Sequence, residues 1–185
     1  MTRIIIRATL NTGRNNMVKY LRKKIPDAEW CFDQKRDAFD TFIRAKRMAG
    51  IEPCVHMEED VLLTKNFRQK IESAIAEHPN HVIQFFSMLR DDAKLGSRWI
   101  NRFSMNQCYY IPAGLNVPIA EYGERWPNRE KDRNGYDVMM DEFRRDMKFK
   151  IWLHVPSLVQ HMEAKSLLGP RSSKRQSGTF QDPDE

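Results

Sequence analysis

Long apolar runs are absent from this chain of 185 residues. A membrane-spanning helix needs roughly 18 consecutive apolar residues, and no segment of the chain approaches that length. The apolar run Ile4–Ile6 is followed at once by Arg7, so it is too short for the apolar region of a secretory signal peptide. We therefore expect a cytoplasmic protein without membrane contact.

Cysteine is also scarce. The three cysteines, Cys31, Cys54 and Cys108, are far apart and odd in number. An odd number cannot form a complete disulfide framework, and the spacing does not match a zinc site. We predict three small, buried, apolar side chains instead. Hydrophobic residues make up 41% of the chain, which is enough for one core.

Acidic residues are few in the first quarter of the chain. Residues 1–47 hold 12 Lys and Arg against 5 Asp and Glu, a net charge of +7, and the remaining residues hold 19 against 20. A polyanionic partner is one interpretation, and a solvated helix face is the other. Neither a zinc finger nor an aromatic RNA-binding motif is present. The basic excess gathers around Lys19, Arg22, Lys23, Lys24, Lys35 and Arg36.

Short apolar segments alternate with segments of helical spacing. Apolar runs predict strands at 4–6, 29–32, 53–57, 82–86, 103–111 and 149–155. Helical spacing predicts helices at 15–24, 37–48, 67–79 and 137–147, with a short helix within 112–126. This alternation predicts a single α/β domain with a mostly parallel central sheet and helices on both faces.

Three acids, Glu58, Glu59 and Asp60, come directly after the strand predicted at 53–57. Ligands of open α/β sheets bind beyond the carboxyl ends of the strands. In an extended segment Glu58 and Asp60 point the same way, so together they would suit Mg²⁺ or Mn²⁺. The alternative is a polar loop before a helix that begins near Asn66. We expect Asp60 in an exposed loop, so that Asp60→Ala leaves the fold intact.

Three further candidates lie in the second half of the chain. His161 ends the segment Pro156–His161 and suits Mn²⁺, although a lone histidine is more often structural. Asp137 lies near the start of a predicted helix, with Asp141 one turn on. One of the two carboxylates could act as a general base, or Asp137 could simply cap the helix.

The C-terminal residues are rich in glycine, serine and basic side chains. The segment Gly169–Ser177 suits contact with phosphate, and a disordered basic tail is the alternative. We predict that residues 169–185 form a flexible tail that closes over the site as a lid. Truncation after Ser166 should then cost little stability.

The order of these motifs resembles the GT-A glycosyltransferases, and among them small glycosyltransferases of phage and bacterial genomes. The resemblance rests on Met57–Val61, on Tyr136–Asp137, and on Pro156–His161 followed by Ser166. Glu59 stands where the family usually has aspartate, and Asp137 stands alone where a pair is common. The resemblance implies a GT-A-like, Rossmann-like domain over 1–168, with a nucleotide-binding half (1–90) and an acceptor half (91–168).

The resemblance also implies a sugar-nucleotide donor, with a UDP-sugar expected, and a role for each motif. The metal ion, Mn²⁺ or Mg²⁺, would be held by Glu58, Asp60 and His161, and Asp137 or Asp141 would be the catalytic base. The nucleoside and its phosphates would be held by Arg7, Thr9, Arg14, Asp33 and Glu59. Closure over the leaving group would involve Arg171, Lys174 and Arg175.

The expected acceptor is a hydroxymethylated pyrimidine of phage DNA, which places a viral enzyme in the host cytoplasm. This acceptor rests on the basic first quarter together with the phage-like pattern. A lipopolysaccharide or another glycan is an alternative acceptor. A non-enzymatic nucleic-acid-binding protein and a metal-dependent nucleotidyltransferase or nuclease are alternative functions. The sequence leaves the oligomeric state open.

Overall fold

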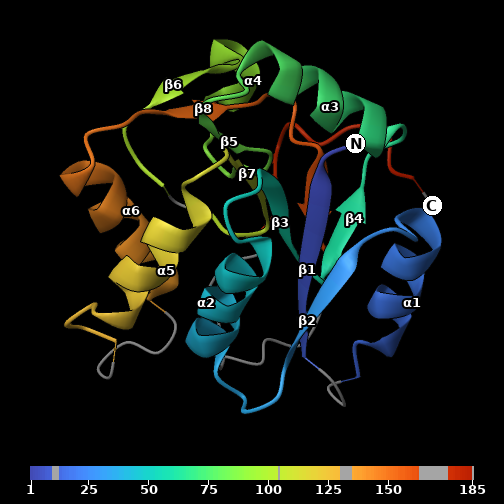
Figure 1. The fold of residues 1–185 in the computed structure, drawn as a ribbon. Helices are drawn as coiled ribbons and strands as arrows, with labels where there is room; N and C mark the ends of the chain where they lie inside the picture. The colour runs from blue at the N-terminus through green and yellow to red at the C-terminus, as the bar shows by residue number, and fades with distance from the viewer. Residues whose placement is uncertain (10–12, 104, 130–134, 163–174, 185) are drawn as a thin grey trace.

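The computed structural model describes residues 1–9, 13–103, 105–129, 135–162 and 175–184. In this part of the chain the strands form a seven-stranded sheet and a two-stranded sheet (Figure 1). The strands are β1 (Arg3–Thr9), β2 (Glu29–Asp33), β3 (Cys54–Glu58), β4 (Val61–Leu63), β5 (Val82–Gln84), β6 (Arg98–Ile100), β7 (Cys108–Ile111), β8 (Ile151–Leu153) and β9 (Val159–His161). The helices are α1 (Asn15–Lys24), α2 (Ala38–Ala49), α3 (Phe67–Glu77), α4 (Asp92–Leu95), α5 (Asn116–Glu124) and α6 (Tyr136–Asp146).

The main sheet has the strand order β2-β1-β3-β7-β5-β8-β6. The pairs β1–β2, β1–β3 and β5–β8 are parallel, and β7 and β6 run against their neighbours. Five strands therefore share one direction, which confirms the predicted mostly parallel sheet. β5, from the first half of the sequence, lies between β7 and β8 of the second half, so both halves contribute to one sheet.

Helices cover both faces of the sheet, as predicted. Ile4 and Ile6 of β1 pack with residues of α1 and α3, whereas Ile5, between them, packs with residues of α2. Figure 1 shows α1 and α2 on opposite sides of β1. A second core joins α2, α5 and α6 over the face that Ile5 shares. Alternation along β1 thus supplies a core to each face.

The local sequence explains where α2 begins and ends. The side chain of Asp37 accepts a hydrogen bond from the backbone N–H of Asp40 at 2.8 Å, which caps the helix. Gly50 ends the helix with a φ of 63°, a value that residues other than glycine rarely adopt. The three cysteines are buried and free, as the sequence predicted.

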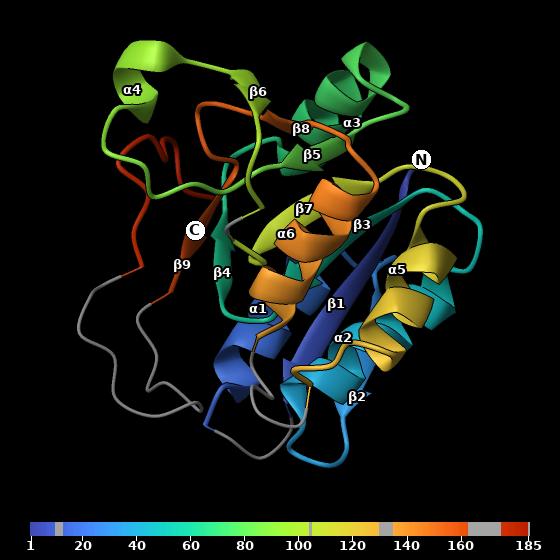
Figure 2. The ribbon, with the colours of Figure 1, turned by 90° about the vertical axis from the view of Figure 1, so that its left-hand side faces the viewer.

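The pair β4–β9 was not predicted. Val61 of β4 pairs with His161 of β9 in a separate antiparallel sheet, and Figure 2 shows the two strands side by side. Strands of three residues are too short for a periodic pattern. β5 and β8, of the same length, were predicted because each lies in a longer, mainly apolar segment, at 82–86 and 149–155. The strand predicted at 103–111 forms only from Cys108 onward.

The C-terminal segment is held against β4 and α1. Backbone hydrogen bonds join Lys65 N to Asp182 O at 2.7 Å and Asp184 N to Leu63 O at 2.8 Å. The Asp184 carboxylate pairs with Lys24 at 2.7 Å. These contacts join residues 175–184 to β4 and α1, and the flexible tail or lid at 169–185 stays a prediction. Residues 169–174, with Arg171 and Lys174, lie outside the described part of the chain.

No helix of the described residues is long and apolar enough to cross a membrane.

Candidate functional site

The carboxyl ends of three neighbouring parallel strands gather most of the predicted site. Arg7 and Thr9 end β1, and they pair in register with Glu58 of β3 and Asp33 of β2. Open α/β sheets bind ligands at this edge. The strand order therefore brings together side chains that lie far apart in the sequence.

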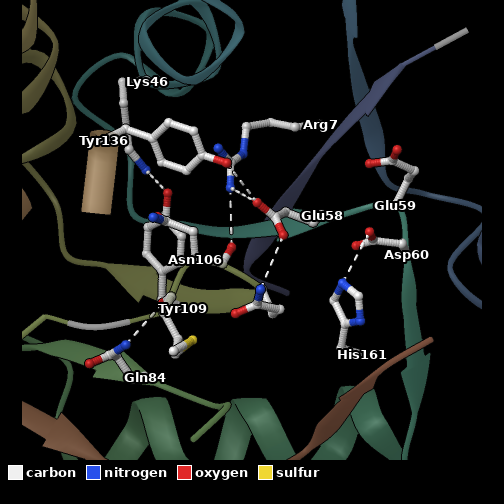
Figure 3. A network of polar contacts seen from close by, with 12 residues as sticks. Arg7, Lys46, Glu58, Glu59, Asp60, Gln84, Asn106, Tyr109, Tyr136 and His161 are labelled. Carbon is white, nitrogen blue, oxygen red and sulfur yellow. Dashed lines mark hydrogen bonds and ion pairs between the residues drawn. The ribbon is translucent and has the colours of Figure 1, made fainter. Parts of the chain in front are cut away.

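Glu58 is the centre of the first polar cluster. Its Oε1 accepts hydrogen bonds from Arg7 Nη2 at 3.3 Å and from the Tyr136 hydroxyl at 3.1 Å, and its Oε2 accepts one from Gln107 Nε2 at 3.4 Å. Arg7 Nη2 also donates to the backbone oxygen of Asn106 at 3.1 Å. We call Arg7, Glu58, Asn106, Gln107 and Tyr136 the Glu58 cluster; Figure 3 shows its main contacts.

Aromatic rings surround the cation of this cluster. The Arg7 guanidinium lies 5.3 Å from the centre of the Phe42 ring and 5.2 Å from that of Tyr136. Burial, and after it the charge of Glu58, raises the pKa of Tyr136 well above its ordinary value. Tyr136 therefore keeps its proton and donates a hydrogen bond to Glu58. The cluster is a nearly neutral, buried group at the end of β3.

Asp60 is the centre of a second cluster. Arg14 Nη1 lies 2.8 Å from Glu59 Oε1 and 2.9 Å from Asp60 Oδ2, and His161 Nε2 lies 3.3 Å from Asp60 Oδ2. The pairing of β4 with β9 brings His161 to Asp60. We call Arg14, Glu59, Asp60 and His161 the Asp60 cluster. Only 4% of Asp60 is exposed, so the expectation of an exposed loop acid is wrong.

The two acids of this cluster have pKa values shifted in opposite directions. Burial, and after it the charge of Asp60, raises the pKa of Glu59 to about 7 against the effect of Arg14. Burial acts on Asp60 in the same direction, but the hydrogen bond and charge of His161 and the charge of Arg14 outweigh it. The pKa of Asp60 is therefore below its ordinary value. Asp60 therefore stays ionised to a lower pH than Glu59 does.

Glu58 and Asp60 do not point the same way. The chain bends at Glu59 and Asp60, so the spacing rule for an extended segment no longer applies. Figure 3 shows Glu58 bound to Arg7 and Asp60 beside His161. Asp60 also binds Arg14. The predicted metal-ligand set is thus divided between the two clusters.

Asp60 and His161 fit a divalent cation on the chemistry of their atoms. Asp60 Oδ1 is buried and has no hydrogen-bond partner among the described residues, and carboxylate oxygen with imidazole nitrogen suits Mn²⁺. Among those residues, no group of three or more His, Cys, Asp or Glu converges as a ligand set. The Arg14 guanidinium supplies the positive charge at this point of the structure.

The two candidate bases occupy different surroundings. Asp137 is half-buried in the first turn of α6, next to Tyr136 of the Glu58 cluster. Asp141 Oδ1 accepts hydrogen bonds from Phe103 N at 2.8 Å and from Arg144 Nε at 3.0 Å. Asp141 therefore holds the segment before β7 against α6, and Asp137 is the acid beside the cluster.

The remaining predicted donor-binding residues lie nearer the rim. Asp33 Oδ1 accepts backbone hydrogen bonds from Lys35 at 3.0 Å and Asp37 at 3.1 Å, so this oxygen holds the turn before α2. Thr9 and Arg175 are half-buried. Arg171 and Lys174 lie outside the described residues.

Sequence reasoning missed four members of the site: Tyr136, Asn106, Gln107 and Gln84. Gln84 interrupts an apolar strand, and Asn106 and Gln107 directly precede one. A polar residue inside or beside an apolar run is seldom buried without a reason, so this signal could have identified them. Tyr136 belongs to one of the motifs behind the resemblance, but it was given no role of its own.

No protein-family model and no curated protein sequence matches the chain. Solved structures of similar fold include a glycosyltransferase involved in the glycosylation of the major capsid of PBCV-1, at 14% identity and a TM-score of 0.51. That match covers 88% of this chain and 96% of the other. A second is A197 from STIV, at 16% identity and a TM-score of 0.51, covering 88% and 87% of the two chains.

A third solved structure is UDP-glucose pyrophosphorylase complexed with UDP-glucose. Its identity to this chain is 10% and its TM-score is 0.52, and the match covers 82% of this chain and 72% of the other. At these identities the likenesses establish the fold alone. The chain shares the α/β architecture of a viral glycosyltransferase and of a sugar nucleotidyltransferase.

Proposed function

We propose that the protein is a metal-dependent glycosyltransferase that uses a sugar nucleotide, with a UDP-sugar as the first candidate. The observation that carries this proposal is the Asp60 cluster, where a buried aspartate with a free oxygen lies beside His161 at the ligand-binding edge. The fold shared with the PBCV-1 glycosyltransferase over 96% of that chain supports it.

The residues of the edge divide the work of binding. Asp60 and His161 would hold Mn²⁺ or Mg²⁺, which when bound offsets the negative charge that develops on a departing diphosphate. Arg14 binds Asp60 and Glu59 and would donate to phosphate oxygens in place of these acids. Thr9 and Asp33 lie at the ends of β1 and β2, where the nucleoside would bind.

The transfer itself needs a proton acceptor near the sugar. A hydroxyl oxygen of the acceptor bonds to the anomeric carbon, the bond from that carbon to the phosphate breaks, and the hydroxyl proton passes to a carboxylate. Asp137 is the carboxylate we assign to this role, because it lies in the first turn of α6 directly after Tyr136 of the Glu58 cluster.

A sugar nucleotidyltransferase is the second candidate. The likeness to UDP-glucose pyrophosphorylase favours it. Such an enzyme would join a nucleoside triphosphate to a sugar 1-phosphate and release pyrophosphate. The two reactions are distinguished by whether the sugar nucleotide is consumed or formed.

For the acceptor we propose a hydroxymethylated pyrimidine in DNA, with a glycan as the alternative. The support is the exposed basic side chains of the first quarter, because Lys and Arg bind phosphates. Several basic residues of that quarter have other roles: Arg3, Arg7, Arg14, Lys24 and Arg47 bind carboxylates, and Lys46 is buried. The exposed ones are Lys19, Arg22, Lys23, Lys35 and Arg36.

A screen of sugar nucleotides with Mn²⁺ tests the reaction. Hydroxymethylated duplex DNA and simple glycans serve as acceptors, and mass spectrometry detects the transferred sugar. We expect one sugar nucleotide to be consumed, with loss of transfer in EDTA and in Asp60→Asn. Full activity in EDTA would refute the metal. Formation of a sugar nucleotide from a nucleoside triphosphate and a sugar 1-phosphate would establish the second candidate instead.

A further inference from the structure

Three amide side chains near Glu58 are buried with polar atoms that lack a partner. Asn106 is 2% exposed, and Gln84 and Gln107 are each 1% exposed. Both amide atoms of Asn106, and Oε1 of each glutamine, have no hydrogen-bond partner among the described residues. Buried polar groups are almost always paired, so each exception indicates a bound water or a ligand.

Asn116 shows what a structural asparagine looks like in the same protein. It is fully buried, its Nδ2 donates to Glu52 O at 3.0 Å, and its Oδ1 lies 2.8 Å from His56 Nε2. Both ends of this amide are thus paired within the protein. The amide of Asn106 has neither contact, so packing alone does not account for an asparagine there.

The three amides gather at the ligand-binding edge. Gln107 Nε2 donates to Glu58 Oε2 at 3.4 Å, and Gln84 Nε2 donates to Met105 O at 2.9 Å. Figure 3 shows Gln84 and Asn106 in the same close view as Glu58. The Glu58 side chain is 16% exposed, and its contact with Gln107 is long and weak.

The unpaired atoms define the chemistry of the ligand. They are three carbonyl oxygens and one amide nitrogen, beside a Glu58–Arg7 ion pair that is already neutral. A hydroxyl group can both donate and accept a hydrogen bond, so a neutral molecule with several hydroxyls matches this set. A phosphate, which only accepts, does not match the carbonyl oxygens.

The order of the strands indicates which part of a donor reaches the amides. Along the edge, Asp33 ends β2, Thr9 ends β1, and the acids follow from the end of β3. Beyond them, Asn106 and Gln107 directly precede β7, and Gln84 ends β5. We propose that Asn106, Gln107 and Gln84 bind the hydroxyls of the sugar in the sugar-nucleotide donor. This inference rests on the proposed function. In it, the three amide side chains determine which sugar the enzyme accepts.

The test separates binding of the sugar from binding of the nucleotide. Isothermal titration calorimetry on the full chain with Mn²⁺ compares UDP with UDP-glucose, UDP-galactose and UDP-N-acetylglucosamine. The variants are Asn106→Leu, which keeps the size of the side chain, and Gln107→Met. Asn101→Ala, an exposed position before the same strand, is the control.

We expect Asn106→Leu to bind UDP as the wild type does and to lose on the order of tenfold in affinity for the preferred UDP-sugar. Its unfolding temperature should stay the same or rise, because the removed atoms had no partner. Asn116→Leu, in contrast, should lower it. Gln107→Met should repeat the selective loss.

Equal effects on UDP and UDP-sugar, or none on either, would overturn the inference and leave the proposed function standing. An Asn106→Leu protein destabilised as much as Asn116→Leu would also overturn it, because the amide would then hold structural water. A wild-type chain that binds none of the UDP-sugars would overturn the UDP-sugar donor and this inference together.

Discussion

At the scale of single residues, Asp60 links stability to activity. It is buried, binds Arg14 at 2.9 Å and lies 3.3 Å from His161. Asp60→Asn should abolish transfer. It should also lower the free energy of unfolding by about 1–3 kcal/mol, because Arg14 and His161 lose a negatively charged partner. Urea unfolding measures the loss. Asp91→Asn, at an exposed position, should unfold like the wild type, and an equally stable Asp60→Asn would contradict this account.

Lys46 makes stability depend on pH. Its Nζ donates to the Tyr109 hydroxyl at 2.8 Å, and burial, and after it the charge of Arg7, lowers its pKa well below the ordinary value. Below about pH 10.4 Lys46 is protonated in the unfolded chain. In the folded chain it stays neutral until the pH falls to its lowered pKa. The unfolded state binds more protons there, so stability from this group increases with pH and is lost as pH falls.

The slope for one proton is about 1.4 kcal/mol per pH unit. We expect the free energy of unfolding of the wild type to rise more between pH 8 and 9 than that of Lys46→Met, by at most that amount. Denaturant unfolding at both pH values measures it. Lys23→Met, at an exposed position, is the control. Identical slopes in wild type and Lys46→Met would mean that Lys46 stays charged in the fold.

The site shows how far residue-level prediction reached. The acids after β3 and His161 were identified from residue type and position, because carboxylates beyond a buried strand are visible in the sequence. The burial of Asp60 was not, since it depends on Arg14 and His161, which only the folded chain brings close. The division between Glu58 and Asp60 depends on a bend that spacing does not encode.

At the scale of elements, the long amphipathic helices and the central strands followed from periodicity. The helix predicted at 15–24 is α1 with the same bounds, and the strand at 29–32 is β2 within one residue. The three-residue strands β4 and β9 depend on pairing across the chain, which a local pattern cannot carry. The backbone contacts of the C-terminal segment also join residues far apart in the sequence, so a local pattern does not predict them either.

That segment should contribute to stability. Ser177 Oγ lies 2.8 Å from Ser157 Oγ, Ser157 N donates to Thr179 Oγ1 at 3.1 Å, and the Tyr20 hydroxyl donates to Asp184 O at 2.8 Å. Each bond contributes about 0.5–1.5 kcal/mol. A chain that ends after residue 174 should therefore lose more than about 2 kcal/mol of unfolding free energy, measured in urea.

Point variants show whether the bonds or the mere presence of the segment matter. Thr179→Val keeps the shape and removes a hydroxyl that Ser157 and Ser177 contact, so we expect part of the loss. Gln181→Ala, at an exposed position, should have no effect. A truncated chain as stable as the full one would show that these contacts contribute nothing.

At the scale of the whole molecule, the charge of the first quarter separates into paired and exposed sets. If the exposed set binds DNA, the logarithm of the affinity should fall linearly with the logarithm of salt concentration, by about 0.9 for each phosphate neutralised. Changing Lys19, Arg22 and Lys23 to Gln should flatten this slope. Fluorescence anisotropy with a hydroxymethylated duplex measures it, and affinity independent of salt would exclude DNA as the acceptor.

The β4–β9 pair has a consequence for the order in which the chain folds. Val61 and His161 are paired although they lie at distant positions in the sequence, and closing so large a loop is entropically costly and slow. The Asp60 cluster is thus assembled only after the chain between these strands has folded. A ligand of that cluster should therefore slow unfolding rather than speed folding. The Asp60 cluster of a nascent chain is complete only once β9 has left the ribosome, because His161 belongs to that strand.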